Sequence, residues 1–488
     1  MESPMMTPPS DMEKEKELTT RQAALIDSAF EEGQYESGIA MLEQLCSPTD
    51  YPSKSHVRQL LYIALYPPPS SRTLAPNHKA SQESPSKISS RHAYSTLLPS
   101  PAASELAKRT LRVLADVNSP ASLLRALPAY PEPTDGNTAP SLADPELPSD
   151  ADSFVALEAV RFRDCKNCWN ILKSGFIKSL SESTSSFPGS PRKRRRGEAP
   201  VKYAHMDEEE SSLVVGENAW PVLDWLLFLF EKDELSTEAS RKVRYSPLLL
   251  AQIPPTRSDT GSKWDANDPL EIVFHCFRQQ DESRRAMGSR LLSLLVNLTS
   301  TNFFDLPLFM NLLIPRLPSG VEEMHDLLSA MSSTSTLCKF KVTMCQRYLT
   351  RSRAGNSRGR GRPRAQPRPL NGIAKQGSVA SVRSDSKSNL SRHTLPPASE
   401  LLHLLTMKAD TDALSKTIKY DLLVTYGIMQ HQAPVEDKSQ DWLEMLQNGR
   451  VTEAVEEAFG GSNDTDALQR ILLGMITTWQ QDLIADGA

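Results

Sequence analysis

The sequence is poor in aromatic residues, which make up 6% of its 488 residues, and hydrophobic residues make up only 39%. Its 36 prolines are concentrated in stretches with few apolar side chains. Such stretches cannot offset the conformational entropy that is lost on folding, because they have too little apolar surface to bury. We therefore expect folded blocks that alternate with disordered linkers.

We expect neither a secretory leader nor a membrane span. The N-terminal segment is polar and partly acidic, with no basic start followed by an apolar run, so we expect no secretory signal. The most apolar run starts at Trp220, but it contains Asp224 and ends at Glu231. It is too short and too charged to cross a bilayer. We predict a buried helix there and no association with a membrane.

Cysteine is also scarce, with six residues in the whole chain. This number fits reduced thiols of the cytosol or nucleus better than a disulfide framework. Cys165 and Cys168 have the spacing of a zinc knuckle, but a structural zinc needs four ligands and no second such pair follows. We expect no metal, and a helical turn in which cysteine and Trp169 face a core.

The motifs of common enzyme classes are absent. We find no phosphate-binding loop, no dinucleotide fingerprint, no HExxH and no GxSxG. His275 lies on an apolar helical face, which predicts a core histidine, and the carboxylates from Asp207 to Glu210 form an acidic loop and not a catalytic pair. We expect no catalytic residue, no cofactor and no small-molecule substrate. An enzyme whose site is assembled from distant residues remains an alternative.

The pattern that is present is helical. Apolar residues recur every three to four positions in several segments, and no run of alternating β-branched residues competes with them. The chain is therefore predicted to be all-α, with helical-hairpin, HEAT-like or TPR-like irregular helical blocks separated by long disordered linkers. In the central block we expect a helical segment over 154–180 and helices over 218–232, 268–279, 282–298, 305–315, 319–332 and 336–350. On the final helix, a stripe predicts core or subunit contacts, and it consists of Leu468, Ile471, Leu472, Met475 and Trp479.

The expected domain organisation follows from these patterns. Residues 1–18 are predicted to be disordered. The chain then continues with an N-terminal helical block (19–66), a disordered linker (67–101), short helices (102–128), a second linker (129–152), a central helical domain (153–180 and 215–350) with a disordered basic insert (181–214), a disordered basic linker (351–397) and a C-terminal helical block (398–485).

Two short segments resemble the turn and second helix of a tetratricopeptide repeat. They are "GQYESGIAMLEQL" from Gly33 and "NGRVTEAVEEAF" from Asn448. The resemblance implies that Gly33 permits a tight turn and that Tyr35, Ile39 and Ala40 pack against a partner helix. Because no regular period links the two segments, we take from them only that helical hairpins are present.

Positive charge is concentrated in one linker, although the net charge of the chain is -5. Seven arginines and no acidic residue lie between Arg351 and Arg368. Such a cluster displaces counterions from a phosphate backbone and binds nucleic acid in a salt-dependent way, whatever the base sequence.

The order of residues in "SRGRGRPRAQPRP", which starts at Ser357, resembles the AT-hook, a short DNA-binding motif. The resemblance implies an extended segment in the minor groove of A·T-rich DNA. Gly359 and Gly361 add no side chain in a tight groove, Pro363 stiffens the exit, Arg360 and Arg362 reach the groove floor, and Arg358 and Arg364 contact phosphates. Two other interpretations stay open, namely a basic linker that serves nuclear import and an RGG-like segment that prefers RNA.

A second basic run, "PRKRRRG", predicts nuclear import. Its basic residues are Arg192, Lys193, Arg194, Arg195 and Arg196. Ser84 and Ser190 each precede a proline and resemble acceptor sites of proline-directed kinases, although chance Ser-Pro pairs in such linkers are an equal alternative. Phosphate on Ser190 would place about two negative charges beside the basic run and weaken its contacts.

Together these features predict a non-enzymatic nuclear scaffold or regulatory subunit of a chromatin-associated complex, acting in transcription regulation or chromosome maintenance. Its expected partners are the minor groove of A·T-rich DNA, through the arginine linker, and other protein subunits, through the helical blocks. An RNA-associated nuclear scaffold is the second hypothesis.

Overall fold

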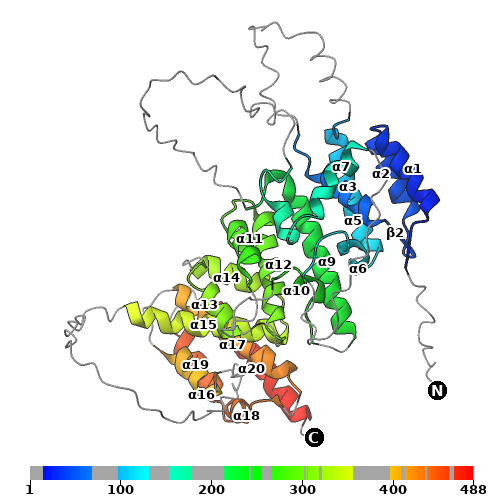
Figure 1. The fold of residues 1–488 in the computed structure, drawn as a ribbon. Helices are drawn as coiled ribbons and strands as arrows, with labels where there is room; N and C mark the ends of the chain where they lie inside the picture. Colours follow the sequence, from blue (N-terminus) through cyan, green and yellow to red (C-terminus); the bar gives the residue numbers. More distant parts are fainter. Residues whose placement is uncertain are drawn as a thin grey trace, which may run out of the picture. The chain divides into compact units, whose positions relative to one another are not determined.

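The computed structural model describes most of the helical parts of the chain. The described residues are 15–68, 97–130, 153–177, 214–240, 243–254, 265–301, 304, 306–317, 321–355, 396–407, 413–434, 437–460 and 466–486. They belong to two compact units, Met1–Phe304 and Asp305–Ala488. Figure 1 shows the helices of both units coloured along the chain.

The predicted all-α class is confirmed, since the described residues are mostly helical. Their only sheet is a two-stranded parallel pair of β1 (Lys16–Glu17) and β2 (Asp50–Tyr51). Within the described part of the chain, every helix falls short of the length or apolarity that a bilayer crossing requires.

Several helices begin at a serine or threonine that the sequence places just before the apolar pattern. In α5 (Pro101–Val117), α6 (Pro120–Leu124) and α10 (Pro247–Leu250), a Ser-Pro dipeptide supplies both the cap and the first helical residue. The serine side chain accepts a hydrogen bond from a free backbone N–H of the first turn, and proline costs nothing at a position whose N–H has no partner. Local chemistry thus fixes these three helix starts.

The first unit opens with the helical hairpin that the sequence predicts. α1 (Thr20–Glu31) and α2 (Tyr35–Leu45) are joined through Gly33, whose φ of 73° is a left-handed conformation that suits glycine. Tyr35 and Ile39 are buried, as expected. α3 (Lys54–Leu65) packs against α5, and α5 against α2. The resemblance to a tetratricopeptide repeat stays a prediction.

The prediction of disorder over 1–18 is wrong at its C-terminal end. Residues 16 and 17 pair with β2, and Leu18 is buried. The Glu15 carboxylate accepts hydrogen bonds from the backbone N–H of Ser119, at 2.7 Å, and from its hydroxyl, at 2.6 Å. This carboxylate lies at the N-terminus of α6, where negative charge is favoured. Residues 15–18 are therefore ordered by contacts with distant parts of the chain.

Several helices of the first unit pack around α9 (Trp220–Ala239), which is buried along much of its length. α9 packs against α5, α6, α10 and α12 (Glu282–Leu298), and α12 packs in turn against α11 (Asn267–Phe277). A short 3-10 helix, η5 (Glu217–Ala219), leads into α9. Asn218 lies inside η5 and Pro221 in the first turn of α9, so this proline is tolerated there as helix geometry predicts.

An ionic network joins three helices of this unit. Arg290 of α12 donates to Glu231 through Nε and Nη2, both at 2.7 Å, and to Asp224 through Nη1 at 2.5 Å. Arg112 of α5 contacts the other oxygen of Asp224 at 3.3 Å. The side chains of Arg290, Asp224 and Glu231 are each about a third exposed. The network therefore stabilises the contact of α5, α9 and α12 at the border of the core.

The helical segment predicted over 154–180 is helical only in part and is not one continuous α-helix. The chain forms α7 (Phe154–Ala159) and two 3-10 helices, η2 (Val160–Phe162) and η3 (Cys168–Leu172). The Asn167 side chain caps η3, and Gly175 adopts a φ of 76°. An asparagine that bonds the backbone locally and a left-handed glycine both interrupt an α-helix.

The second unit contains the last eight helices that the structure describes. They are α13 (Leu306–Leu313), α14 (Val321–Ala330), α15 (Ser335–Gly355), α16 (Ala398–Thr406), α17 (Ala413–Gln432), α18 (Gln440–Gln447), α19 (Arg450–Phe459) and α20 (Asp466–Asp486). α15 packs along α17, while α16 packs against α17, α18 and α19. α15 runs to residue 355, so it includes the first five residues of the predicted linker 351–397. The boundary between the two units also lies inside the predicted central domain.

Three lysines bind carbonyl oxygens at helix C-termini. Lys232 Nζ donates to the carbonyls of Ala115, Asp116 and Asn118, at the end of α5, over 2.8–2.9 Å. In the second unit, Lys341 and Lys419 do the same just beyond α14 and α16, at 2.8 and 2.6 Å. Burial lowers the pKa of all three ammonium groups. Each one satisfies carbonyls that the helix leaves without an internal partner.

Candidate functional site

The site residues that the sequence predicts lie outside the described residues. This holds for the AT-hook-like residues 358–364, for the basic run 192–196, and for Ser84 and Ser190. Among the described serines that precede a proline, Ser100, Ser119 and Ser246 serve as helix caps, and the Ser47 hydroxyl donates to the Asp50 carboxylate. A Ser-Pro pair in this chain is therefore no indication by itself of a phosphorylation site.

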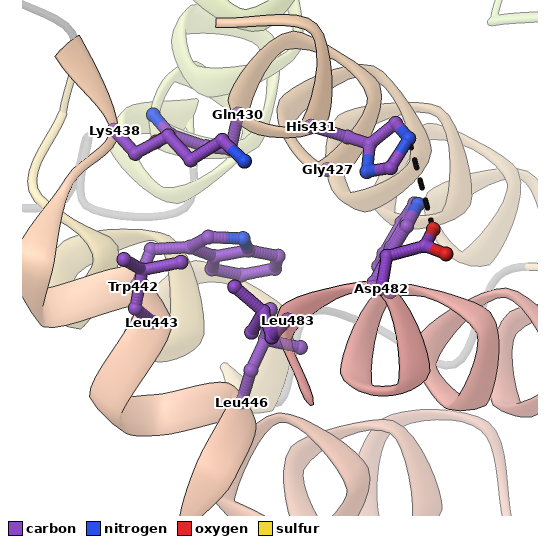
Figure 2. A pocket seen from close by; sticks show the side chains of 10 residues that line it. Gly427, Gln430, His431, Lys438, Trp442, Leu443, Leu446, Asp482 and Leu483 are labelled. Atoms are coloured by element: carbon purple, nitrogen blue, oxygen red, sulfur yellow. Dashed lines mark ion pairs between the residues drawn. The ribbon is translucent and has the colours of Figure 1, made fainter. Parts of the chain in front are cut away.

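A small concavity in the second unit is one candidate site among the described residues. It is shallow and open to solvent, with a cavity volume of only about 20 Å³, and lies where α17, α18 and α20 meet (Figure 2). This volume is far below the usual range for ligand pockets, which is about 300–1,000 Å³. The concavity is lined by Gly427, Gln430, His431, Lys438, Trp442, Leu443, Leu446, Trp479, Asp482 and Leu483.

Its apolar wall is built on an aromatic cluster. The Trp442 ring centre lies 5.1 Å from that of Tyr426 and 6.2 Å from that of Trp479, and both pairs meet edge to face. Trp479 lies so close to Gly427 that a Cβ atom on this glycine would overlap its ring. Rings in this arrangement attract each other beyond the effect of their buried area. The wall is therefore a rigid surface, and it depends on a glycine in α17.

The rim of the concavity carries the polar groups. His431 Nε2 lies 3.8 Å from Asp482 Oδ2, and both side chains are about half exposed. Figure 2 shows this pair at one side of the concavity, with the Trp442 ring beside it and Leu446 and Leu483 below. Gln430 is held in place because its side-chain oxygen accepts a hydrogen bond from the backbone N–H of Ser439 at 2.8 Å. Because Trp442, Leu446 and Trp479 are buried, the depression exposes little apolar surface beside this rim.

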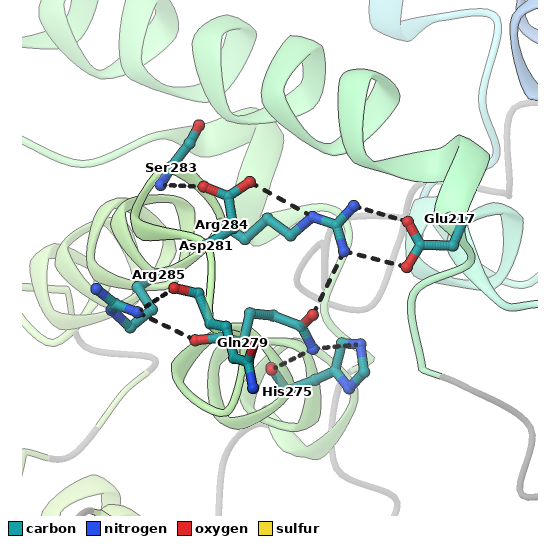
Figure 3. Close-up of polar contacts among 8 residues, drawn as sticks. Glu217, His275, Gln279, Asp281, Ser283, Arg284 and Arg285 are labelled. Carbon is teal, nitrogen blue, oxygen red and sulfur yellow. Dashed lines mark hydrogen bonds and ion pairs between the residues drawn. The ribbon is translucent and has the colours of Figure 1, made fainter.

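A second cluster lies in the first unit, where η5 and α9 meet the turn between α11 and α12 (Figure 3). Arg284 makes a bidentate pair with Glu217, with N–O distances of 3.1 and 2.7 Å. Its guanidinium also lies 4.6 Å from the centre of the Trp220 ring. His275 stacks on the same indole, with ring centres 5.7 Å apart and an interplanar angle of 13°. The cluster thus holds the start of α9 to the α11–α12 turn.

His275 departs from the prediction of a core histidine, because it is half-buried and lies at the border of the core. Burial lowers the pKa of His275, and the positive charges of Arg278 and Arg284 lower it further. Gln279 Nε2 lies 3.3 Å from His275 Nε2, where an amide can donate only to an unprotonated ring nitrogen. These contacts favour the neutral imidazole.

The cysteines of the zinc-knuckle spacing do not converge. Cys168 and Trp169 are buried in η3, as the turn interpretation predicts, and burial raises the pKa of the Cys168 thiol well above its usual value. The Cys165 thiol donates to the carbonyl of Arg161 at 3.4 Å, and burial raises its pKa to about 11. Across the described segments, no group of three or more His, Cys, Asp or Glu side chains could hold a metal ion.

A scan against protein-family models and searches of the curated proteins and of the solved structures find no match to this chain. The resemblances to an AT-hook and to a tetratricopeptide repeat therefore stay predictions.

The concavity was only partly predictable from the sequence. Trp479 belongs to the predicted stripe on the final helix, and Leu472 and Trp479 of this stripe are buried. Ile471 departs from the stripe, because 49% of it is exposed. Trp442, Leu443 and Leu446 were not predicted, although their spacing on α18 already indicated an apolar face.

Proposed function

We infer that the protein is a nuclear scaffold or regulatory subunit without catalytic activity, which holds a chromatin-associated complex on A·T-rich DNA. The helical units bind other protein subunits, and the segment 358–364 binds the minor groove. Transcription regulation and chromosome maintenance are the processes that such a tether serves.

The observation that carries this proposal is the order Arg358-Gly359-Arg360-Gly361-Arg362-Pro363-Arg364 within an otherwise acidic chain. Arginine is attracted to the strong negative potential of a narrow minor groove, and glycine allows the backbone to approach the groove floor. A plain basic linker requires no such order. The basic run 192–196 supports a nuclear location independently.

The test compares the peptide 345–375 on an A·T-rich duplex, a G·C duplex and single-stranded RNA at equal salt. We expect tightest binding to the A·T-rich duplex, and a loss of about tenfold or more when Arg360→Ala and Arg362→Ala are combined, because each groove contact contributes about 1–3 kcal/mol. Equal affinity for both duplexes would contradict the motif, and preference for RNA would favour the RNA-associated scaffold.

A control in the full chain separates the motif from general charge. The double variant Arg383→Ala, Arg392→Ala removes the same charge from the same linker but leaves 358–364 intact. We expect it to weaken binding equally on all duplexes through lost phosphate contacts, with no change in A·T preference. Replacement of residues 192–196 by alanine should exclude a fluorescent fusion from nuclei.

A further inference from the structure

The basic linker is a loop of the second unit. The chain leaves that unit at the end of α15, which continues to residue 355, and it returns at residue 396, just before α16. α15 and α16 are in contact, since Gln346 Nε2 of α15 donates to Glu400 Oε1 of α16 at 2.8 Å. A ligand of residues 356–395 is therefore tethered to the second unit from both ends.

The AT-hook-like residues follow α15 directly in the chain. Arg358 is three residues beyond Gly355, the last residue of α15, and three residues span at most about 11 Å. A duplex that holds Arg358 at the edge of its minor groove therefore comes within a similar distance of the end of α15. Exposed charges interact over about 8 Å at physiological ionic strength. The last turns of α15 are thus close enough to act on the phosphates.

The sequence of α15 is positively charged and contains no acidic residue. Its basic residues are Lys339, Lys341, Arg347, Arg351 and Arg353, and three of these five lie within residues 347–355. The dipole of a helix leaves partial negative charge at its C-terminus, which repels phosphate, and positive side chains in the last turns offset this charge. The end of α15 therefore has the charge that a phosphate backbone requires.

The neighbours of α15 do not cancel this charge. Arg347 Nη1 donates to the side-chain oxygen of Asn311 at 3.2 Å, and this partner is a neutral amide. Glu400, which accepts the hydrogen bond from Gln346, can offset at most one of the three arginine charges. The Asp421 carboxylate of α17 lies 2.7 Å from His325 and is largely buried. The end of α15 thus keeps a positive excess for a ligand.

We propose that the C-terminal end of α15 is a second DNA-binding surface, which contacts the phosphate backbone beside the tract that residues 358–364 occupy. Arg347, Arg351 and Arg353 supply its positive charge. The inference rests on the proposed function for the position of the duplex, and it adds that the second unit itself lies against the DNA. A hook on a long tether would instead leave this unit free of the duplex.

The contact is tested first by photo-crosslinking of the full chain to a labelled A·T-rich duplex. Thr350 is exposed on α15 and its hydroxyl donates to the carbonyl of Gln346 in the same helix, so p-benzoylphenylalanine can replace it without loss of core packing. The matched control is Thr477 of α20, which is also exposed and donates four residues back. We expect cross-links to DNA from position 350 and only background from position 477. Equal yields would overturn the proposal.

A flexible spacer tests the short connection without altering charge. About 20 Gly and Ser residues are inserted between Gly355 and Asn356 of the full chain. Because the effective concentration of a tethered contact falls with about the 3/2 power of linker length, we expect the affinity for an A·T-rich duplex to fall about threefold to twentyfold. The matched control carries the same spacer between Gly377 and Ser378, which lengthens the same loop behind residues 358–364, and it should bind as the wild type does. Equal affinities of the two spacer variants would overturn the proposal.

The role of the arginines is tested by the salt dependence of binding. Arg351→Gln with Arg353→Gln should reduce the slope of log affinity against log salt concentration by about 2, because each lost phosphate contact reduces it by about 0.9. The preference for A·T-rich DNA should persist. The matched control, Arg450→Gln with Arg470→Gln, removes two exposed charges from α19 and α20 of the same unit and should keep the wild-type slope. A wild-type slope in the first variant would overturn the contact.

These readouts separate this inference from the proposed function. A preference for A·T-rich DNA with no cross-links from position 350, and with equal affinities of the two spacer variants, overturns the α15 contact and leaves the proposed function standing. Cross-links from position 350 to A·T-rich and G·C duplexes alike, with no A·T preference, support the α15 surface and count against groove binding by residues 358–364.

Discussion

At the scale of single residues, Gly427 leaves the space that the Trp479 ring occupies against α17. An alanine in place of a helical glycine usually stabilises a protein by about 0.5–1 kcal/mol, because it restricts the unfolded chain. At Gly427 the added methyl group would overlap the Trp479 ring, which is held on its other side by the aromatic cluster. The contact with Trp479 therefore makes an alanine at position 427 destabilising, where an alanine in place of a helical glycine is usually stabilising.

We expect Gly427→Ala to lower the free energy of unfolding by about 1–3 kcal/mol, as overpacking does in other cores. The matched control is Gly474→Ala on α20, where nothing lies within 4 Å of an added Cβ. This control should be neutral or stabilising. Urea unfolding followed by tryptophan fluorescence measures both, and equal effects of the two variants would contradict the packing argument.

His275 predicts how stability changes with pH. Because its pKa is lowered in the folded state, the unfolded chain binds a proton at higher pH than the folded chain does. Stability therefore falls as pH decreases through about 6.5, the ordinary value for histidine. We expect the loss of stability between pH 7.5 and 5.5 to be smaller in His275→Gln than in the wild type. The hydrogen bond from Arg284 lowers the pKa of Glu217, so protonation of this carboxyl affects stability only below about pH 4.5, outside the range of the test.

For each protein, the urea midpoint at pH 5.5 is subtracted from the midpoint at pH 7.5. The loss of stacking on Trp220 lowers both midpoints of the variant equally, so it does not affect this difference. Buried carboxyls such as Glu234 and Asp421, whose pKa values burial raises, titrate in both proteins and cancel as well. An identical difference in variant and wild type would show that His275 does not contribute.

At the scale of helices, the ionic network of Arg290 predicts how α12 is held to α9. Arg290→Met keeps the apolar stem but leaves Asp224 with only Arg112 and leaves Glu231 without its two hydrogen bonds. We expect the free energy of unfolding to fall by about 1–2 kcal/mol. This loss is smaller than for a fully buried pair, because all three side chains are about a third exposed and solvent screens their charges.

The matched control is Arg109→Met on α5. Its guanidinium lies 3.6 Å from Glu43 and its side chain is 67% exposed, so removal should change stability by no more than about 0.5 kcal/mol. Thermal unfolding of both variants tests the network. If Arg109→Met lowered the unfolding temperature as much as Arg290→Met does, the place of Arg290 at the border of the core would not explain its effect on stability.

The same scale explains what the sequence could predict. The helix over 282–298 has the predicted ends, because Asp281 caps its N-terminus and its apolar residues keep a helical period. Over 154–180 the burial of Val155, Phe162 and Cys168 was also predictable, but the α-helix was not. Short 3-10 turns bury residues at similar intervals, so periodicity cannot tell the two backbones apart.

The concavity shows the limit of such patterns. Its lining comes from three separate helices within residues 413–486, and their meeting depends on packing that no local spacing records. By contrast, the AT-hook-like order of residues 358–364 is local and needs no fold, so it was visible in the sequence alone.

At the scale of the whole molecule, the chain contains two compact units, each with its own buried residues. Units with separate cores unfold as separate cooperative transitions. We expect calorimetry to resolve two transitions, with Arg290→Met lowering the midpoint of one and Gly427→Ala that of the other. A single transition, or a shift of the same transition by both variants, would show that the two units fold as one.

The lysines at the helix ends have a practical consequence for chemical footprinting. Acylating reagents need an unprotonated amine that is free to react, and Lys232, Lys341 and Lys419 all donate to backbone carbonyls in half-buried or buried positions. Surface amines should be acylated first, and these three only when the ends of α5, α14 and α16 fray. The rate at which each lysine is acylated would then report how often one helix terminus opens in the intact protein.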